Sequence, residues 1–320
     1  MKHQENAASQ VKKKIRFNQT MLLVVLMAVI IIALTINNPL FLSWRNIKNI
    51  LLQNAVAGIA TVGMCILMIS GGIDLSIGNQ ISFYGCLLAL LLKNGMNEVL
   101  APMLVLLIAT ALGALSGLII SNTSAAPFII TLGLMNVYKA AALIVSNGSD
   151  IPINKFTFLG RTPVLTIMLP VWIFLILFLI VGYVLRYLQF GRTVYAIGSN
   201  VDAAYISGVG VKSMKVWAYT INGLLVGLAA AVLLSRLGSA VPTMGDGYEM
   251  TAIAACAIGG ITLSGGEGNA LGAFLGVLFL GIIRNGLNII GVESFYQYLV
   301  NGIIIIIAVV LSNFSNKNRS

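Results

Sequence analysis

The sequence predicts an all-α, polytopic membrane protein with about ten transmembrane helices, some of them broken or re-entrant, and with both termini in the cytoplasm. Of its 320 residues, 58% are hydrophobic and only 9% are charged, which is not the composition of a soluble domain of this size. Apolar stretches of about 20 residues, the length that crosses a bilayer, recur along the whole chain. The lipid bilayer is therefore its expected surroundings.

The predicted organisation is one membrane domain with two short polar tails. We expect cytoplasmic tails at residues 1–19 and 313–320 and a single transmembrane domain at 20–312, because no polar insertion is long enough to form a second domain. The eighth span is too short to cross a hydrocarbon core of about 30 Å unless it is partly re-entrant. The predicted spans are residues 20–36, 50–70, 77–92, 99–120, 128–146, 164–184, 214–235, 250–263, 268–288 and 296–312.

The first span resembles a cleaved signal peptide, because a basic cluster from Lys12 to Arg16 precedes its apolar run. The run is followed by Asn37, Asn38 and Pro39, however, and not by small residues that would form a cleavage site. We therefore interpret residues 20–36 as a membrane helix with a basic cytoplasmic end.

Basic residues set the predicted orientation, since they concentrate on the cytoplasmic side of membrane proteins. With the N-terminus inside and ten crossings, the cytoplasmic side carries eleven Lys and Arg: Lys2, Lys12, Lys13, Lys14, Arg16, Arg186, Arg192, Lys212, Lys215, Lys317 and Arg319. The outer side carries six: Arg45, Lys48, Lys93, Lys155, Arg161 and Arg236. The net charge of +10 is therefore a topology signal and does not predict a nucleic-acid partner.

Several chemistries are excluded by the residue inventory. The only histidine is His3, so neither a membrane-embedded Ser–His dyad nor a His-ligated metal is expected. Cys65, Cys86 and Cys256 lie in apolar segments without CxxC spacing and are typical of small packed residues. No GxxxxGK[ST] motif is present, so the chain is not expected to bind ATP through a P-loop. We expect no catalytic residue, metal or cofactor.

Two glycine-rich breaks interrupt the apolar segments. The first reads GGIDLSIGN from Gly71 to Asn79, and similar residues return as GGITLSGGEGN from Gly259 to Asn269. A charge such as that of Asp74 costs about 2.5–3.5 kcal/mol at membrane depth, so it usually faces protein or water. Two broken helices in a polytopic chain suggest a transporter; the alternative is two tight cytoplasmic turns. The candidate pathway residues here are Gly71, Gly72, Asp74, Ser76, Gly259, Gly260 and Ser264.

Asp74 is expected to organise the first break, at or near the cytoplasmic end of a pathway. Its carboxylate can accept hydrogen bonds from the free amides at the start of the third helix, where Ser76 can also act as a cap. Lys139 and Arg284 fall inside the fifth and ninth spans. They need a partner or an aqueous cavity, unless they snorkel to the interface.

Glycines repeat every four residues on several predicted helices and predict close helix packing. Such packing can occur within the chain, which we favour, or at a subunit interface. The repeats are Gly268, Gly272 and Gly276; Gly113 and Gly117; and Gly223 and Gly227.

The longest cytoplasmic loop, residues 185–213, predicts a short helix from Val201 to Ser207. Asn200 is a good N-cap, Asp202 suits the first turn, and Gly208 can end the helix in the left-handed conformation. Helices shorter than about 12–15 residues do not persist alone. The helix must therefore dock, either on a partner or on the cytoplasmic ends of this chain. Its small or aromatic side chains suit a shallow groove: Ala203, Ala204, Tyr205 and Ser207.

Five blocks in order along the chain resemble the permease subunits of bacterial ABC sugar importers of the ribose, xylose, galactose and autoinducer-2 type. The blocks are Gly71–Gly78, Pro127–Lys139, Gly191–Gly208, Gly247–Gly268 and Asn285–Val292. The resemblance implies a multi-pass protein of the bacterial plasma (inner) membrane. It also implies three partners: a cytoplasmic ABC ATPase that binds the ATP, an extracytoplasmic sugar-binding protein, and a second permease, identical or paralogous.

The resemblance further implies that residues 199–208 form the helix that couples to the ATPase. The residues concerned are Ser199, Asn200, Asp202, Ala203, Ala204, Tyr205, Ser207 and Gly208. Three positions depart from the family pattern: Tyr205 stands where arginine is usual, Ala140 where glycine is preferred, and Thr251 where aspartate is common. The first concerns ATPase docking, and the other two concern the substrate or a heterodimer partner.

Two classes of function remain. The first is the transmembrane subunit of an ATP-driven importer of a monosaccharide or a sugar-like solute. The second is a secondary transporter driven by an ion gradient, which usually needs buried acidic relays. Asp74 is the sole carboxylate expected near membrane depth, and a secondary transporter has no evident use for a docking loop. We therefore favour the importer; the sequence names neither the sugar nor the dimer type.

Overall fold

The computed structural model describes residues 19–293, 295–297, 299–300, 302–304 and 306. Both predicted tails, apart from Gln19, lie outside the described residues, as does part of the tenth predicted span. The residues described between 295 and 306 are helical.

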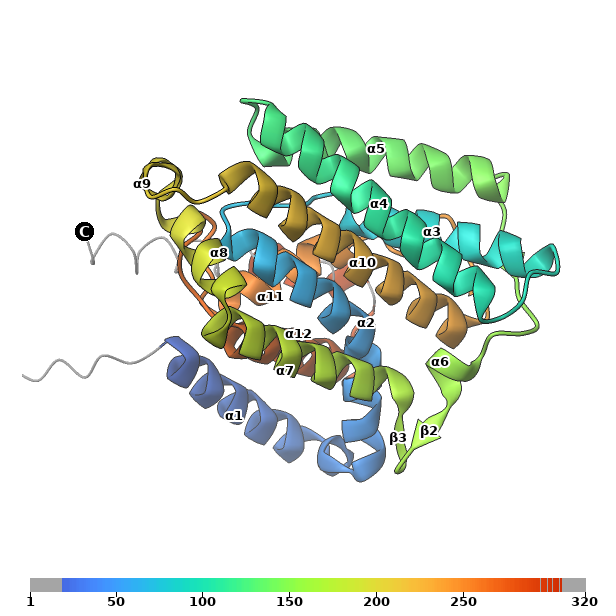
Figure 1. The fold of residues 1–320 in the computed structure, drawn as a ribbon. Coiled ribbons are helices and arrows are strands. Elements are labelled where there is room, and N and C mark those ends of the chain that lie inside the picture. Colours follow the sequence, from blue (N-terminus) through green and yellow to red (C-terminus); the bar gives the residue numbers. More distant parts are fainter. Residues whose placement is uncertain (1–18, 294, 298, 301, 305, 307–320) are drawn as a thin grey trace, which may run out of the picture.

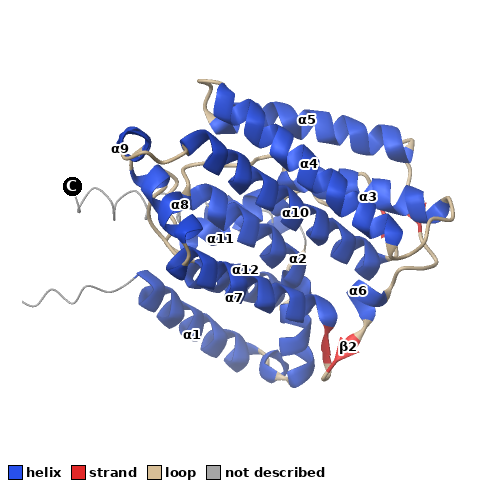
Figure 2. Ribbon diagram, in the orientation of Figure 1, coloured by secondary structure: helices blue, strands red, loops and turns tan. Residues whose placement is uncertain are grey.

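The described chain is a bundle of helices with four two-residue strands (Figure 2), which confirms the predicted all-α class. The number of spans and the side of the two termini stay predictions. Seven helices are long and apolar enough to cross a membrane. These are α1 (Gln19–Asn37), α2 (Trp44–Ile69), α4 (Leu100–Asn122), α5 (Pro127–Ser146), α7 (Leu169–Tyr187), α10 (Val211–Leu237) and α12 (Ala270–Ile289). Two apolar helices are shorter: α3 (Ile77–Lys93) and α11 (Tyr248–Ile258).

Short elements mark the two ends of the bundle (Figure 1). At one end lie α8 (Gln189–Ser199) and α9 (Val201–Ile206), and we name this the α9 end. At the opposite end, the α6 end, lie α6 (Phe158–Arg161) and the hairpin of β2 (Pro163–Val164) and β3 (Ile167–Met168). The remaining short elements are the 3-10 helix η1 (Pro39–Leu42) and the paired strands β1 (Ile151–Pro152) and β4 (Ser239–Ala240).

Helix α2 forms the centre of the bundle, since 83% of its most apolar 18-residue stretch is buried inside the protein. Helices α1 and α5 lie at the periphery, with 11% and 17% buried. The difference follows from composition: the inner half of α2 is rich in Ala and Gly, which let helices approach closely, whereas α1 carries large apolar side chains on all faces.

Glycines join α4 to α10. A Cβ atom on Gly113 would lie 3.0 Å from the Cα atom of Gly223, and one on Gly117 would lie 2.7 Å from the Cα atom of Val216. Gly272 and Gly276 of α12 similarly face the carbonyl groups of α11 and of the turn that follows it. The repeats therefore serve packing within the chain. Gly268 is an exception, because it precedes α12 and has φ +115°.

Several predicted boundaries are wrong for local reasons. Helix α2 starts at Trp44, not at residue 50, because the Ser43 hydroxyl accepts a hydrogen bond from the Asn46 amide (3.3 Å). The sixth span starts at Leu169, not at residue 164, because the residues before it form the β2–β3 hairpin. Helix α11 ends at Ile258, not at residue 263, because Gly260 turns the chain with φ +88°.

We predict that Gly113→Ala destabilises the protein by about 1–3 kcal/mol, because the added methyl group overpacks the α4–α10 contact. The measurement is thermal unfolding in detergent. The matched control is Gly182→Ala in α7, where the Cβ atom would meet only the Ala270 methyl group at 3.7 Å. This control should be neutral or slightly stabilising, because alanine favours a helix over glycine by about 1 kcal/mol. Equal effects in the two variants would contradict the packing argument.

Candidate translocation and coupling site

Asp74 lies inside the bundle, in the segment between α2 and α3, with 2% of its surface exposed. The chain reaches the α9 end at Ile69, and residues 71–76 then fold back between the helices. The Ile73 carbonyl accepts hydrogen bonds from Tyr219 of α10 (3.2 Å) and Thr131 of α5 (3.3 Å). Because Asp74 also contacts Asn222, near the middle of α10, α3 begins well within the bundle.

Four donors surround the Asp74 carboxylate. Oδ1 accepts from the backbone amide (2.9 Å) and the hydroxyl (2.5 Å) of Ser76. Oδ2 accepts from Gln80 Nε2 and Asn222 Nδ2, each at 2.9 Å. Ser76, Gln80 and Asn222 are themselves buried. This set of donors lets a carboxylate remain in a region that otherwise penalises charge.

The same cluster contains buried oxygen atoms without a hydrogen-bond partner among the described residues. They are Gln80 Oε1, Asn222 Oδ1 and the Tyr84 hydroxyl. The side-chain amides of Gln80 and Asn222 direct their NH2 groups to Asp74, so their oxygen atoms point away from it. Asn222 fits beside α2 only because Gly63 has no side chain: a Cβ atom there would lie 3.2 Å from Cγ of Asn222.

These contacts correct three expectations. Asp74 lies near the middle of the bundle, not at its end, because residues 71–76 re-enter it. The alternative of a tight turn outside the membrane helices is wrong for the first break, since the Asp74 carboxylate is buried among them. Ser76 precedes α3 but does not cap it, because its hydroxyl donates to Asp74.

The two glycine-rich breaks meet at the α9 end, against the last turn of α8. The Gly266 amide donates to the Ile69 carbonyl (2.8 Å). A Cβ atom on Gly265 would lie 2.8 Å from the Cα atom of Gly71 and 3.1 Å from that of Gly198. We call the backbone contact of Gly71, Gly198 and Gly265 the glycine junction.

The other residues of the breaks have separate places around this junction. The Ser264 carbonyl lies 3.7 Å from the position of a Cβ atom on Gly71, and a Cβ atom on Gly72 would lie 3.1 Å from the Tyr219 hydroxyl. Gly259 packs against Gly272 of α12. The structure therefore brings Gly71, Ser264 and Gly198 together and places Gly259 outside this contact.

Helix α9 follows α8 directly, starts at the predicted Val201 and ends at Ile206, one residue before the predicted end. Asn200 Oδ1 accepts from the Ala203 amide (2.9 Å), and Gly208 has φ +80°. Asp202 lies in the first turn. The Ser207 hydroxyl donates to the Ala203 carbonyl (2.8 Å), and the Ser199 side chain faces Gly266.

The two faces of α9 differ. Ala204 is buried against Ile197 and Val211, which corrects its assignment to a docking face. Tyr205 and Ile206 are 72% and 84% exposed. The packing of Ala204 confirms that one face of the helix docks on this chain. Docking of the exposed face on a partner stays a prediction.

An exposed surface with polar residues, which we name the α5 face, lies on the side of the bundle formed by α5 and the loop before α11. Asn136 and Lys139 are exposed within α5, and Asp246 is exposed in the loop. Lys139 and Asp246 are close enough to interact electrostatically. The loop packs on the inner part of α3, where the Ser82 hydroxyl accepts from the Gly245 amide (3.0 Å). A charge such as that of Lys139, exposed within a helix long enough to span the membrane, is costly when it faces lipid. The face must therefore be covered by water or by protein.

Arg284 does not belong to this face. It is half-buried near the end of α12 that lies at the α6 end, close enough to Tyr248 for an electrostatic interaction. Its position fits a side chain that reaches toward the membrane interface. Of the departures from the family pattern, Ala140 is exposed beside Lys139, whereas the Thr251 hydroxyl donates to the Gly247 carbonyl (2.9 Å).

Some functional candidates were missed by sequence reasoning. Asn222 had a detectable signal, because an asparagine in an apolar span needs a partner. Gln80 lies six residues after Asp74, but the spacing does not reveal that the chain folds back. Helix α8, with Gly198, lies within the segment 185–213 that the sequence predicts as a loop around one short helix. The contact of Gly198 with the two breaks is long-range and leaves no local pattern.

Residues 46–309 match a family model described as the permease component of branched-chain amino acid transport systems. The ribose import permease protein RbsC of Bacillus subtilis is 42% identical over 88% of this chain and 89% of that protein. RbsC of Escherichia coli K12 is 37% identical (91% and 92%), and the D-allose permease protein AlsC of the same strain is 36% identical (87% and 86%). No solved structure matches the chain.

We predict that Asp74→Asn keeps the fold, whereas Asp74→Leu loses it. In the asparagine variant, the partnerless oxygens of Gln80 and Asn222 can turn to accept from the new amide. Leucine removes the acceptor of the Asn222 NH2 group and of the Ser76 amide and hydroxyl, and one of the two acceptors of the Gln80 NH2 group. Each buried donor left unpaired costs about 1–3 kcal/mol. The measurement is folded yield after detergent extraction, followed by thermal unfolding. Equal stability of both variants would contradict the proposed role of the carboxylate.

Proposed function

Because this chain belongs to the family of permease components of branched-chain amino acid transport systems and is the permease subunit of a sugar ABC importer, we propose that its α9 end takes up force from a separate ATPase and that its α5 face lines the sugar path. It is a multi-pass protein of the bacterial inner membrane and a transport subunit. The ion-coupled alternative has no support from the relatives.

The exposed face of α9 carries the proposal for the ATPase. The helix is too short to persist alone, yet it is capped at both ends and fixed on α8 through Ala204. It therefore presents Tyr205 and Ile206 rigidly away from the bundle. Two large apolar side chains held on a small rigid helix suit a hydrophobic groove on a partner. On this proposal the α9 end is cytoplasmic, and ATP is bound by the partner and not by this chain.

The glycine junction is the proposed route for force into the bundle. Movement of α9 displaces Gly198, which touches both glycine-rich breaks through backbone atoms. The first break continues into residues 71–76 and so into the Asp74 cluster, which binds α3 to α10. A shift at α9 would therefore move the segment that sets the depth of α3.

The α5 face is the proposed sugar path. Its amide, ammonium and carboxylate groups, on Asn136, Lys139 and Asp246, can bind sugar hydroxyl groups. Such a path needs a second wall, so we propose a second permease, identical or paralogous, facing α5. The sugar-binding protein is proposed to deliver its ligand at the α6 end. The relatives point to a monosaccharide of the ribose and allose kind.

We predict that Ile206→Glu reduces ATPase binding by at least about tenfold, because a charge would be buried in an apolar groove. The measurement is retention of the ATPase on the immobilised permease. Leu165→Glu is the matched control, since Leu165 is equally exposed (82%) but lies at the α6 end; it should bind the ATPase normally. Normal ATPase binding by the Ile206 variant would contradict the docking assignment.

The same variants test energy coupling in proteoliposomes with ATPase and loaded binding protein. Uptake should require ATP, persist with a protonophore and fail in the Ile206 variant. Uptake that continues without ATP and collapses with the protonophore would contradict the proposed energy source.

We predict that Lys139→Met lowers sugar uptake by about tenfold, as expected for loss of a hydrogen bond from a charged group. ATPase stimulation by the binding protein should remain, because α9 is unaffected. The control is Lys93→Met, an exposed lysine at the end of α3. If the control lowers uptake equally, or if Lys139→Met has no effect, the lysine does not line the path.

A further inference from the structure

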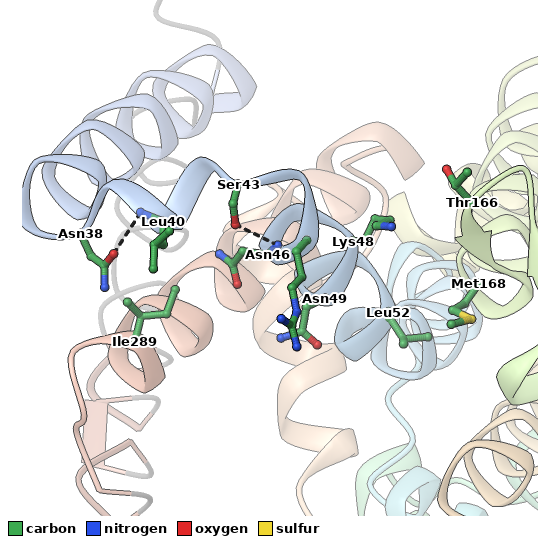
Figure 3. A pocket seen from close by; sticks show the side chains of 11 residues that line it. Asn38, Leu40, Ser43, Asn46, Lys48, Asn49, Leu52, Thr166, Met168 and Ile289 are labelled. Carbon is green, nitrogen blue, oxygen red and sulfur yellow. Dashed lines mark hydrogen bonds between the residues drawn. The ribbon is translucent and has the colours of Figure 1, made fainter.

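A cavity of about 810 Å³ opens at the α6 end, away from both the α5 face and the α9 end. It lies between η1, the first turns of α2, the β2–β3 hairpin and the end of α12 (Figure 3). Its lining is of two kinds. Polar groups come from the first turns of α2, from the two residues that flank η1 and from Thr166, and apolar side chains come from Leu40, Leu52, Met168 and Ile289.

Two basic residues of the lining, Arg45 and Lys48, lack an acidic partner. In the described part of the chain neither side chain makes an ion pair or a hydrogen bond, and the Lys48 ammonium only lies over the Trp44 ring, 5.8 Å from its centroid. Positive charges left unpaired in a partly apolar cavity favour an anionic ligand.

The part of the lining that Asn46 forms is held rigidly. The Asn46 side chain donates to the Phe41 carbonyl (2.8 Å) and exchanges two hydrogen bonds with Asn285 of α12 (2.9 and 3.0 Å). Phe41 is buried. The cavity is therefore formed before any ligand arrives, which lowers the entropy cost of binding.

The surroundings of the cavity belong to the membrane. Helix α1 leads to its rim and exposes apolar side chains such as Ile32 and Ile36, at 59% and 78%. Trp44 is 55% exposed, as is typical of aromatic residues at a membrane interface. A ligand with an anionic head and apolar tails matches this arrangement: its head would lie between Arg45 and Lys48, and its tails would lie along α1.

We propose that this cavity binds the headgroup of an anionic phospholipid. The shared chemistry is a phosphate between a guanidinium and an ammonium group, so a soluble phosphate is the other possible source. The volume of the cavity favours the lipid, because a bare phosphate would fill only a small part of the cavity and would leave its apolar lining exposed to water. A phosphate with a glycerol backbone covers both kinds of lining.

The test uses the purified permease in nanodiscs of phosphatidylcholine with and without phosphatidylglycerol, and counts the retained phosphatidylglycerol by native mass spectrometry. The double variant Arg45→Gln/Lys48→Gln should retain it about tenfold less, as expected for loss of two juxtamembrane charges. The control Lys93→Gln/Lys155→Gln removes two exposed charges at the same end and should retain it normally. Retention by the wild type should also fall as salt is raised.

Three results would overturn the proposal. Equal loss in the control pair would show a general charge effect. Displacement of phosphatidylglycerol by millimolar inorganic phosphate or glycerol 3-phosphate would show a site for soluble anions. Unchanged retention in the double variant, with weaker docking of the binding protein, would assign the charges to a protein partner. None of these readouts requires transport, so they do not depend on the proposed coupling mechanism.

Discussion

A carboxylate in a membrane bundle is stable only when its hydrogen bonds are met by protein, and the Asp74 cluster meets that condition. Its donors come from the start of α3 and from the middle of α10. The interaction therefore fixes the register of two helices against each other. Removing the charge without replacing its acceptor atoms would leave several buried donors unpaired, which costs more than the net value of the bonds themselves.

Much of the architecture follows from this constraint. Because Asp74 lies near the middle of α10, the chain must re-enter the bundle after α2, and α3 must start inside it. Helix α5 packs along this inner start, through Thr131 and through the Met135 carbonyl, which accepts from Asn79 (3.1 Å). The loop before α11 occupies the space beside α3. The residues that α5 leaves uncovered include Asn136 and Lys139 as well as apolar side chains, and the sugar path is proposed at the two polar residues.

The sequence predicted most of this fold from local signals. Hydrophobic runs located the spans, and an N-cap with a left-handed glycine located α9 within one residue at its end. The tenth span stays a prediction beyond residue 306. What local signals did not predict depends on contacts far apart in the chain. No pattern near Asp74 reveals Asn222 as its partner 148 residues away, and no pattern near Ala204 shows that it faces Ile197 and Val211.

The proposed coupling depends on direct backbone contact between α8 and the two glycine-rich breaks. A contact through long side chains can absorb displacement by changing rotamers, whereas backbone atoms packed against each other cannot. At the glycine junction, Gly198 and Gly265 approach the first break without a side chain between them, and Gly265 has φ +87°, where other residues are strained. A displacement of α8 must therefore shift the break or separate from it. The Gly266 amide donates a hydrogen bond to the Ile69 carbonyl, so separation would leave both groups unpaired. A joint shift of α8 and the break therefore costs less free energy than their separation.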